Sequence, residues 1–376
     1  MSLLDLVPAP GQDPDWAALC RLLPDLRALD RCPQDPVWHA EGDVGIHTRM
    51  VLAWLCASER WRSLPLEDRQ VVFLACLLHD IAKPAVTRTE DDGRITSRGH
   101  SRRGASVARV LLWELDVPFA VREAVCGLVL RHQLPFYLID RPDLVRQAVE
   151  VSLTVGCARL ALVAEADALG REAADRQRLV DNVGLFREHC AEAGILDRPW
   201  PFDSDHQRFL YFHKPDRDLY APAWDDTRAE VVLMSGLPGA GKDTWVSRHA
   251  GDLPVVSLDA LREALEVDPT DAQGAVIQAA REQARVYLRQ GQPFVWNATN
   301  LSRELRGGLV DLCTAYKARV RVVYCEAGHA RLWAQNRERA QPVPESVIQR
   351  LLSRWVVPEI TEAHRVEVVI AGEPCP

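Results

Sequence analysis

The fold of the second half of the chain is decided by the stretch Val231-Val232-Leu233-Met234-Ser235-Gly236-Leu237-Pro238-Gly239-Ala240-Gly241-Lys242-Asp243-Thr244. It opens with a short apolar run, the pattern of a strand that is buried on both faces. A glycine-rich turn follows, and the chain then continues with a helical pattern. A strand, the spacing Gly-x-x-x-x-Gly-Lys and a helix together predict a phosphate-binding loop.

The chemistry of phosphate binding explains these residue types. Glycines let backbone N–H groups turn inward around phosphate oxygens, and the start of the helix adds the positive end of its dipole. Lys242 supplies a compact cation for the β- and γ-phosphates. The sequence therefore predicts a site for ATP or another nucleoside triphosphate with Mg²⁺. Its residues are Gly236, Gly239, Ala240, Gly241, Lys242, Asp243 and Thr244.

One position departs from the usual pattern. The residue after the lysine is normally Ser or Thr, whose hydroxyl binds Mg²⁺, but here it is Asp243. A carboxylate is also a hard oxygen ligand, so Asp243 is one candidate for holding Mg²⁺. Thr244 is the other, with a shifted start of the helix, and the sequence leaves both open.

Composition narrows the class of protein. A length of 376 residues favours two or three domains, and a hydrophobic content of 47% is ample for their cores. We expect no membrane segment and no signal peptide, because no apolar run has membrane-spanning length. The ten cysteines are scattered without a Cys-x-x-Cys pair, which favours a reducing cytoplasm. With a net charge of −8, local arginines must bind any polyanion.

The apolar pattern divides the chain into three parts. In residues 1–196, apolar residues recur at helical spacing almost throughout, and no convincing strand pattern is present. This predicts an all-α domain. Residues 197–228 are rich in proline and aromatics, which predicts an ordered connecting strap without a long helix. The expected helices of the first domain are Met50–Trp61, Val71–His79, Ala105–Leu115, Ala120–Arg131, Val145–Leu169 and Gln177–Ala193.

Residues 229–376 alternate between strand and helix patterns, which predicts an α/β domain with a mostly parallel sheet and helices on both faces. The expected strands are Val231–Ser235, Val255–Leu258, Phe294–Asn297, Val320–Cys325 and Val366–Ile370. The expected helices are Asp243–Ala250, Ala260–Leu265, Ala275–Arg289, Arg303–Tyr316, Ala330–Arg339 and Glu345–Arg354.

The helical half carries a candidate metal site. His79 and Asp80 end an apolar helix with two adjacent ligand types, and Asp167 lies inside the apolar run Leu162–Leu169. A charged aspartate buried in such a run needs a partner or a metal. Mixed nitrogen and oxygen ligands suit Mn, Fe, Co, Ni or Zn, and such an ion can generate hydroxide for attack on phosphorus.

The order His47, His79-Asp80, Asp167 in a helical domain resembles the HD phosphohydrolases. The resemblance implies that these four residues are metal ligands and that Asp80 can bridge two ions. His100, in a polar loop, and His132, at the end of a helix, match the extra histidines of binuclear members. Lys83 matches a lysine that is common after the pair, and it is expected to contact phosphate.

The α/β half carries candidate catalytic residues. Asp259 follows a strand beside the phosphate loop and faces the expected crevice, where it either accepts a proton from an attacking hydroxyl or caps the helix. Arg262, one helical turn later, shares its face and can hold a substrate phosphate. Arg337 and Arg339 belong either to a lid that closes over the triphosphate or to a solvated charged face.

These motifs together resemble the polynucleotide 5′-kinases of phage and bacterial end-healing systems, over about residues 229–356. The resemblance implies that Asp259 is the general base, Arg262 the acceptor-phosphate clamp, and Arg337 and Arg339 lid arginines. An HD domain ahead of such a kinase is similar to the bacterial HD–polynucleotide kinase fusions, a resemblance that spans nearly the whole chain.

The expected activity is bifunctional healing of nucleic-acid ends. The C-terminal domain would phosphorylate 5′-OH ends of RNA or DNA, and the N-terminal domain would hydrolyse phosphate at the other end, with a ligase as a partner. The resemblance alone implies that these are 2′,3′-cyclic phosphate or 2′-phosphate ends. One alternative is a small-molecule or nucleotide kinase fused to an HD nucleotidase. The other is a nucleotide-gated sensor without enzymatic activity, in which the helical half only binds.

Overall fold

The computed structural model describes residues 2–267, 273–339 and 342–372. The chain divides into two compact units, Met1–Trp200 and Pro201–Pro376. Most of the predicted connecting strap 197–228 therefore belongs to the second unit.

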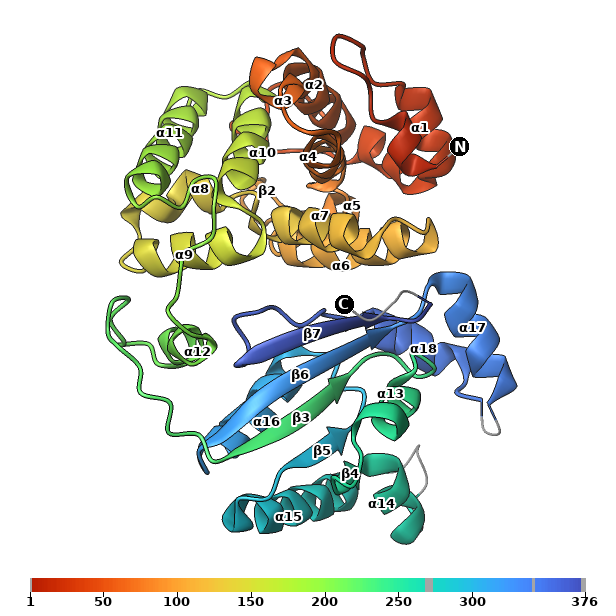
Figure 1. Ribbon diagram of the computed structural model, residues 1–376. Helices are drawn as coiled ribbons and strands as arrows, with labels where there is room; N and C mark the ends of the chain where they lie inside the picture. The colour runs from red at the N-terminus through yellow and green to blue at the C-terminus, as the bar shows by residue number, and fades with distance from the viewer. Residues whose placement is uncertain (1, 268–272, 340–341, 373–376) are drawn as a thin grey trace. The chain divides into compact units, whose positions relative to one another are not determined.

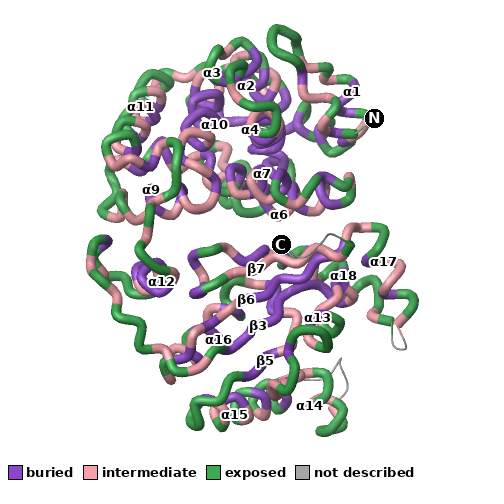
Figure 2. Tube along the Cα trace, in the orientation of Figure 1, coloured by how far each residue is buried: buried purple, intermediate pink, exposed green. Residues whose placement is uncertain are grey.

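The first unit is helical and is built around α4 and α10, whose residues are buried on nearly every side (Figures 1 and 2). A helix that is apolar all round lies in the centre of a domain, and the other helices of the unit pack around these two. The helices are α1 (Trp16–Leu22), α2 (Val44–Ala57), α3 (Glu59–Arg62), α4 (Leu66–Leu78), α5 (Lys83–Val86), α6 (His100–Glu114), α7 (Phe119–Arg131), α8 (Leu134–Tyr137), α9 (Leu144–Thr154), α10 (Cys157–Leu169) and α11 (Arg176–Glu192).

Three expectations for this unit were wrong. The predicted helix Val145–Leu169 is two helices bent by 104°, because Gly156 has a φ of 83° that interrupts the helical path. A short antiparallel hairpin, β1 (Arg88–Thr89) with β2 (Ile95–Thr96), lies where no strand was expected. Its strands are only two residues long and Ile95 is their single apolar residue, so they show no hydrophobic pattern. His100 is the first residue of α6 and not part of a loop.

The described part of the second unit contains a five-stranded sheet in the order β4-β5-β3-β6-β7 (Figure 1). Each neighbouring pair is parallel, which confirms the predicted α/β class. β3 lies in the centre, so the phosphate loop leaves the sheet at its middle strand. The strands are β3 (Ala229–Ser235), β4 (Val255–Ser257), β5 (Phe294–Asn297), β6 (Ala318–Glu326) and β7 (Arg365–Ile370).

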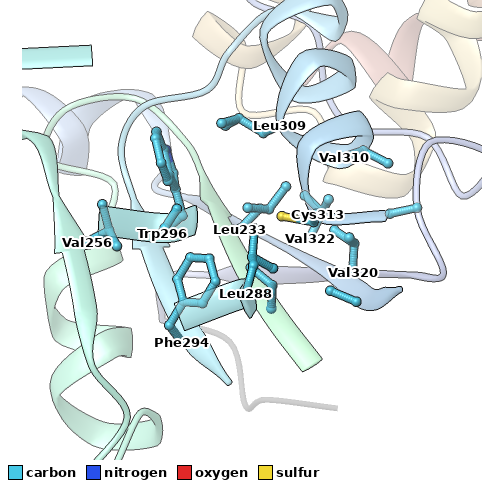
Figure 3. Packing of buried hydrophobic residues seen from close by; sticks show 14 of the residues in the cluster. Leu233, Val256, Leu288, Phe294, Trp296, Leu309, Val310, Cys313, Val320 and Val322 are labelled. Atoms are coloured by element: carbon cyan, nitrogen blue, oxygen red, sulfur yellow. The ribbon is translucent and has the colours of Figure 1, made fainter. Parts of the chain in front are cut away.

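One hydrophobic cluster of this unit lies on one face of the sheet, where alternate strand residues such as Leu233 and Trp296 meet Leu288 of α15 and Cys313 of α16 (Figure 3). Phe209 of α12 joins the same cluster, so the predicted strap contains a short helix that packs on the core. The helices are α12 (Asp205–His213), α13 (Lys242–His249), α14 (Leu258–Ala264), α15 (Gly274–Gln290), α16 (Arg303–Thr314), α17 (His329–Glu338) and α18 (Glu345–Leu352).

Two properties bear on where the chain resides. Within the described ranges, no single helix is both long and apolar enough to cross a bilayer. Only α9 and α10 taken together, which are bent by 104° at their junction, have that length and composition. Every cysteine in those ranges is a buried, free thiol.

Candidate functional sites

The first unit brings all six predicted ligands into one buried cluster. Five elements supply them: α2, the turn after α4, the start of α6, the residue after α7, and α10. Each of the six has at most 7% of its surface exposed, which is unusual for ionisable side chains without partners. The six residues are His47, His79, Asp80, His100, His132 and Asp167.

Backbone carbonyl oxygens fix the orientation of the four imidazole rings. A carbonyl oxygen only accepts, so each Nδ1 donates its hydrogen, and in the neutral ring the lone pair is then on Nε2. The pairs are His47 with Gly170 at 3.1 Å, His79 with Cys76 at 2.7 Å, His100 with Ser97 at 2.9 Å and His132 with Val129 at 2.8 Å. In the last three pairs the carbonyl group belongs to the residue three positions before the histidine. Local backbone turns therefore determine the orientation of these three rings.

The free Nε2 atoms converge in two pairs. Nε2 of His47 lies 3.2 Å from Nε2 of His79, and Nε2 of His100 lies 3.3 Å from Nε2 of His132. Lone pairs that face each other at such distances need a cation between or beside them. The rings therefore have the geometry of metal ligands.

Asp80 lies between the two pairs. Its Oδ2 is 3.2 Å from Nε2 of His79, and its Oδ1 is 3.5 Å from Nε2 of His100. That Oδ1 is buried and accepts no hydrogen bond within the described residues. Asp80 thus completes one ligand group with His47 and His79 and a second with His100 and His132. The donor set fits two transition-metal ions that share one carboxylate.

Asp167 contacts the cluster from α10, with Oδ1 3.2 Å from Nε2 of His47. Burial raises the pKa of both aspartates, but the nearby cations outweigh burial and hold each pKa well below its usual value. Beside Asp80 the permanent cation is Lys83, 2.8 Å away, and beside Asp167 it is Arg171, 2.6 Å away. Both carboxylates are therefore ionised at neutral pH and suited to bind a cation.

A cavity of about 550 Å³ opens above the cluster, and Lys83 and His100 belong to its wall. Nζ of Lys83 donates to Oδ2 of Asp80 and to Oε1 of Gln34, both at 2.8 Å. Its ammonium group is therefore held beside the ligands, where it can meet an anionic substrate.

Arg171 and Gln34 were not predicted as site residues. Arg171 follows Asp167 at i,i+4 spacing, and that spacing is the signal in the sequence that could have found it. Gln34 lies far from the ligands in the sequence and carries no such signal.

In the second unit the loop after β3 has the backbone of a phosphate cradle. Gly236, Gly239 and Gly241 have φ values of 145°, 80° and 94°, which favour glycine. A Cβ on Gly236 would lie 2.3 Å from the carbonyl oxygen of Cys325. Nζ of Lys242 donates to the carbonyl oxygens of Gly236 and Leu237, both at 2.9 Å.

A cavity of about 540 Å³ lies over this loop. The lining residues that were predicted are Gly239, Gly241, Lys242, Asp243, Thr244 and Arg339. Gln335 of α17 also lines it, whereas Asp259, Arg262 and Arg337 do not. Burial lowers the pKa of Lys242 to about 8, and the charge of Asp243 partly offsets that effect.

Asp259 follows β4, whose carboxyl end lies at the same edge of the sheet as the phosphate loop, and its charge acts to raise the pKa of Lys242. It is 78% exposed at its side chain and accepts a hydrogen bond from Nη1 of Arg262. Oγ of Ser257 accepts from the N–H of Ala260 and caps α14, so Asp259 does not have the capping role.

Asp243 has a neighbour that was not predicted as a site residue. Nδ2 of Asn297, the last residue of β5, donates to Oδ1 of Asp243 at 2.7 Å. In a parallel sheet the carboxyl ends of β3, β4 and β5 meet at one edge, which brings Asn297 and the residues around Asp259 to the phosphate loop.

Comparison with known proteins agrees with this division. The model of the HD domain matches residues 44–171, and the model of an AAA domain matches residues 231–358. The chain thus joins a helical HD domain to a P-loop, kinase-like domain. An HD domain implies a divalent metal, and a P-loop kinase-like domain implies a nucleotide with Mg²⁺.

Relatives of this chain include multifunctional CCA proteins and a tRNA nucleotidyltransferase. A multifunctional CCA protein of Psychromonas ingrahamii is 30% identical over 154 residues, which are 38% of this chain and 35% of that protein. One of Xanthomonas campestris pv. campestris is 33% identical over 49% of this chain and 44% of its own length. A CC-adding tRNA nucleotidyltransferase of Thermus thermophilus is 39% identical over 26% of this chain and 20% of its own length. The chain thus spans less than half the length of these relatives.

Solved structures with similarity to this chain include two small-molecule kinases. A sugar kinase from Janibacter sp. is 20% identical with a TM-score of 0.31, over 39% of this chain and 87% of that one. A gluconokinase from Sinorhizobium meliloti 1021 is 19% identical with a TM-score of 0.30, over 39% of this chain and 86% of that one.

Proposed function

We propose that this chain is a bifunctional enzyme that heals nucleic-acid ends. Its C-terminal unit transfers the γ-phosphate of a nucleoside triphosphate to a 5′-OH end, and its N-terminal unit hydrolyses 2′,3′-cyclic phosphate or 2′-phosphate ends. The observation that carries the proposal is the pairing, in one chain, of a phosphate loop with a buried histidine–aspartate cluster that has a lysine at its cavity wall.

In the kinase reaction Asp259 takes the proton of the 5′-OH group. The freed oxygen attacks the γ-phosphorus, the bond to the β-phosphate oxygen breaks, and a nucleoside diphosphate leaves. Lys242 offsets charge on the β- and γ-phosphates, and Arg262 holds the phosphate next to the acceptor. Asp243, which Asn297 orients, or Thr244 would hold Mg²⁺. Arg337 and Arg339, as lid arginines, offset negative charge on the triphosphate.

In the hydrolytic reaction a water molecule adds to phosphorus, one ester P–O bond breaks, and the leaving ribose oxygen takes a proton. When bound, a transition-metal ion supplies Lewis acidity that lowers the pKa of water and polarises the phosphate. His47, His79, Asp80, His100, His132 and Asp167 would hold one or two such ions. Lys83, which is 2.8 Å from Asp80, would bind a phosphate oxygen and offset the charge that develops on it.

The names of the relatives support an RNA substrate, because they describe CCA addition and tRNA nucleotidyl transfer. Buried free thiols favour a reducing compartment, so we place the reaction in the cytoplasm. Cleavage of the P–O3′ bond of the cyclic ester frees the 3′-OH and leaves a 2′-phosphate, which a second hydrolysis releases as inorganic phosphate. The resulting 5′-phosphate and 3′-OH are the ends that a partner ligase would join.

The test is an oligonucleotide with a 5′-OH and a 2′,3′-cyclic phosphate, incubated with labelled ATP and a transition metal. Asp80→Ala should stop end hydrolysis and leave 5′ phosphorylation intact, and Lys242→Ala should do the reverse. His189→Ala, a histidine outside the cluster, serves as the matched control. Faster reaction with nucleosides than with oligonucleotides would favour the metabolic alternative. Loss of both activities in a folded Asp80→Ala protein would contradict separate sites.

A further inference from the structure

The cavity above the HD cluster has two large aromatic side chains on its wall. Trp38 and Tyr137 both line it, and each is 50% exposed. Large aromatic rings are usually mostly buried, so half-exposed rings at the mouth of a polar site are available for a ligand. They come from distant parts of the chain, the loop before α2 and the end of α8.

Each ring is tied to the metal ligands through an intermediate residue. Trp38 precedes His39, whose ring packs edge-on against that of His47 with the centroids 4.9 Å apart. Tyr137 packs edge-on against Phe136 at 6.1 Å, and the guanidinium group of Arg171 lies 5.4 Å from the Phe136 ring. Arg171 in turn binds Asp167.

The loop that carries Trp38 is also anchored by its backbone. The carboxylate of Asp35 accepts hydrogen bonds from the N–H of Val37 at 3.0 Å and of Ile95 at 3.2 Å. The N–H of Trp38 itself donates to the carbonyl oxygen of Asp35 at 3.1 Å. Both rings are thus held in place relative to the cluster.

The charges on the wall are suited to a phosphodiester. The chain as a whole has a net charge of −8, yet this wall carries Lys83, Arg98, Arg171 and Arg178. The wall also carries the acids Asp35 and Asp175, so its basic residues are in excess. Asp175 pairs with Arg178 at 2.8 Å, whereas Asp35 accepts hydrogen bonds from backbone N–H groups. Arg98, a wall residue of this cavity, is exposed, so it can contact a phosphate of the RNA backbone other than the one that reacts.

We infer that the N-terminal site takes a terminal nucleotide whose base is unpaired, and that Trp38 and Tyr137 bind this base by stacking. The inference rests on the proposed hydrolysis of phosphates at the 3′ terminus. It further specifies that the terminal nucleotide is single-stranded. Every base has a π face, so such a site tolerates any sequence. A base inside a duplex already stacks on its neighbours and must first be extruded, which costs free energy. Single-stranded ends are therefore the substrate, and ends recessed in a duplex are not.

The experiment compares RNAs that share a 2′,3′-cyclic phosphate terminus. One carries it on a single-stranded 3′ overhang, the second at a blunt duplex end, and the third on an overhang whose terminal nucleotide lacks its base. For the native protein, kcat/KM on the overhang should exceed the other two by roughly tenfold or more, since stacking contributes about that much for each base. The difference should lie mainly in KM.

The variants are Trp38→Ala and Tyr137→Ala, with Trp38→Phe as the conservative change. Each alanine variant should lose roughly five- to a hundredfold in kcat/KM on the overhang, and Trp38→Phe should restore most of the loss. On the RNA whose terminal nucleotide lacks its base, the alanine variants should match the native protein, because neither ring then has a base to stack on. Trp224→Ala, which removes an 87% exposed tryptophan of the other unit, is the control for loss of a surface ring.

The outcomes separate this inference from the proposed function. Hydrolysis of none of the three RNAs would overturn the proposed function itself. Hydrolysis of overhang and blunt ends at equal kcat/KM would overturn the inference and leave the proposed function standing. Overhang activity that is unchanged in both alanine variants would also overturn it, and would point to an apolar or peptide ligand for these rings.

Discussion

Nε2 of His47 lies 3.2 Å from Nε2 of His79, although Nδ1 of each ring faces a backbone carbonyl oxygen. Two carbonyl-bound imidazoles cannot both place a hydrogen between these nitrogens. The same relationship recurs in His100 and His132, and Asp80 reaches both pairs. A protein retains such an arrangement of lone pairs only when a cation balances it.

The first prediction concerns metal content. Asp80→Asn should lower the bound transition metal by most of its wild-type value, because both ligand groups lose a charged oxygen. His132→Gln should remove only the ion bound by Asp80, His100 and His132. The ion bound by His47, His79 and Asp80 should remain. The measurement is metal per chain by plasma mass spectrometry after dialysis, with His189→Gln as control. Unchanged metal in Asp80→Asn would rule out its place as the shared ligand.

The second prediction concerns the pH dependence of nucleotide binding. Burial lowers the pKa of Lys242 to about 8, and bound phosphates favour the ammonium form, so binding raises that pKa. Below pH 8 the amine is already charged and the Kd of ATP should be constant. Above pH 8 binding must take up a proton, so the affinity should weaken by roughly tenfold for each pH unit.

Calorimetry with ATP and Mg²⁺ from pH 6.5 to 9.5 measures this dependence. Lys242→Ala should bind weakly, and its Kd should lack the break near pH 8. A wild-type Kd that stays constant to pH 9.5 would contradict the lowered pKa.

The sequence predicted the sheet well because its strands are short apolar runs between helices. The predicted strand Phe294–Asn297 has the observed bounds, and Val231–Ser235 differs by two residues at its start. Buried parallel strands are apolar on both faces, so their ends coincide with the change to polar residues. The sequence around β1 and β2 shows no such change, so the hairpin was not predicted. At Gly156 the sequence is equally compatible with a bend and with a glycine inside a continuous helix.

Most of the predicted ligands met in space because they lie at the end or on the buried face of an apolar helix, whereas His100 begins α6, whose first turn is polar. Their partners could not be found in the same way. Asn297 reaches Asp243 only because β5 lies next to β3, and Gln34 reaches Lys83 from a loop without periodicity. Contacts that depend on the order of strands or on loop paths leave no spacing in the sequence.

The third prediction concerns Asp259. If it is the general base, Asp259→Ala should leave the Kd of ATP nearly unchanged and lower kcat for 5′ phosphorylation by roughly a hundredfold or more. Its bond to Arg262 means that the acceptor KM should rise as well, because the guanidinium group loses its partner. Glu263→Ala, an exposed acid on the same helix, is the matched control. Full activity of Asp259→Ala would exclude it as the base.

The last prediction decides which residue holds Mg²⁺ in the kinase unit. The carboxylate of Asp243 is oriented by Asn297 through a 2.7 Å hydrogen bond, and both it and Thr244 line the cavity over the loop. If Asp243 is the ligand, Asp243→Ala should raise the Mg²⁺ concentration for half-maximal activity by roughly tenfold or more, since a hard anionic oxygen is lost. Asn297→Ala should shift it in the same direction by less, because the carboxylate remains but loses its orientation. Thr244→Ala should leave the Mg²⁺ titration nearly unchanged. A large shift in Thr244→Ala with none in Asp243→Ala would assign the ion to the hydroxyl, and the bond between Asn297 and Asp243 would then only brace the loop.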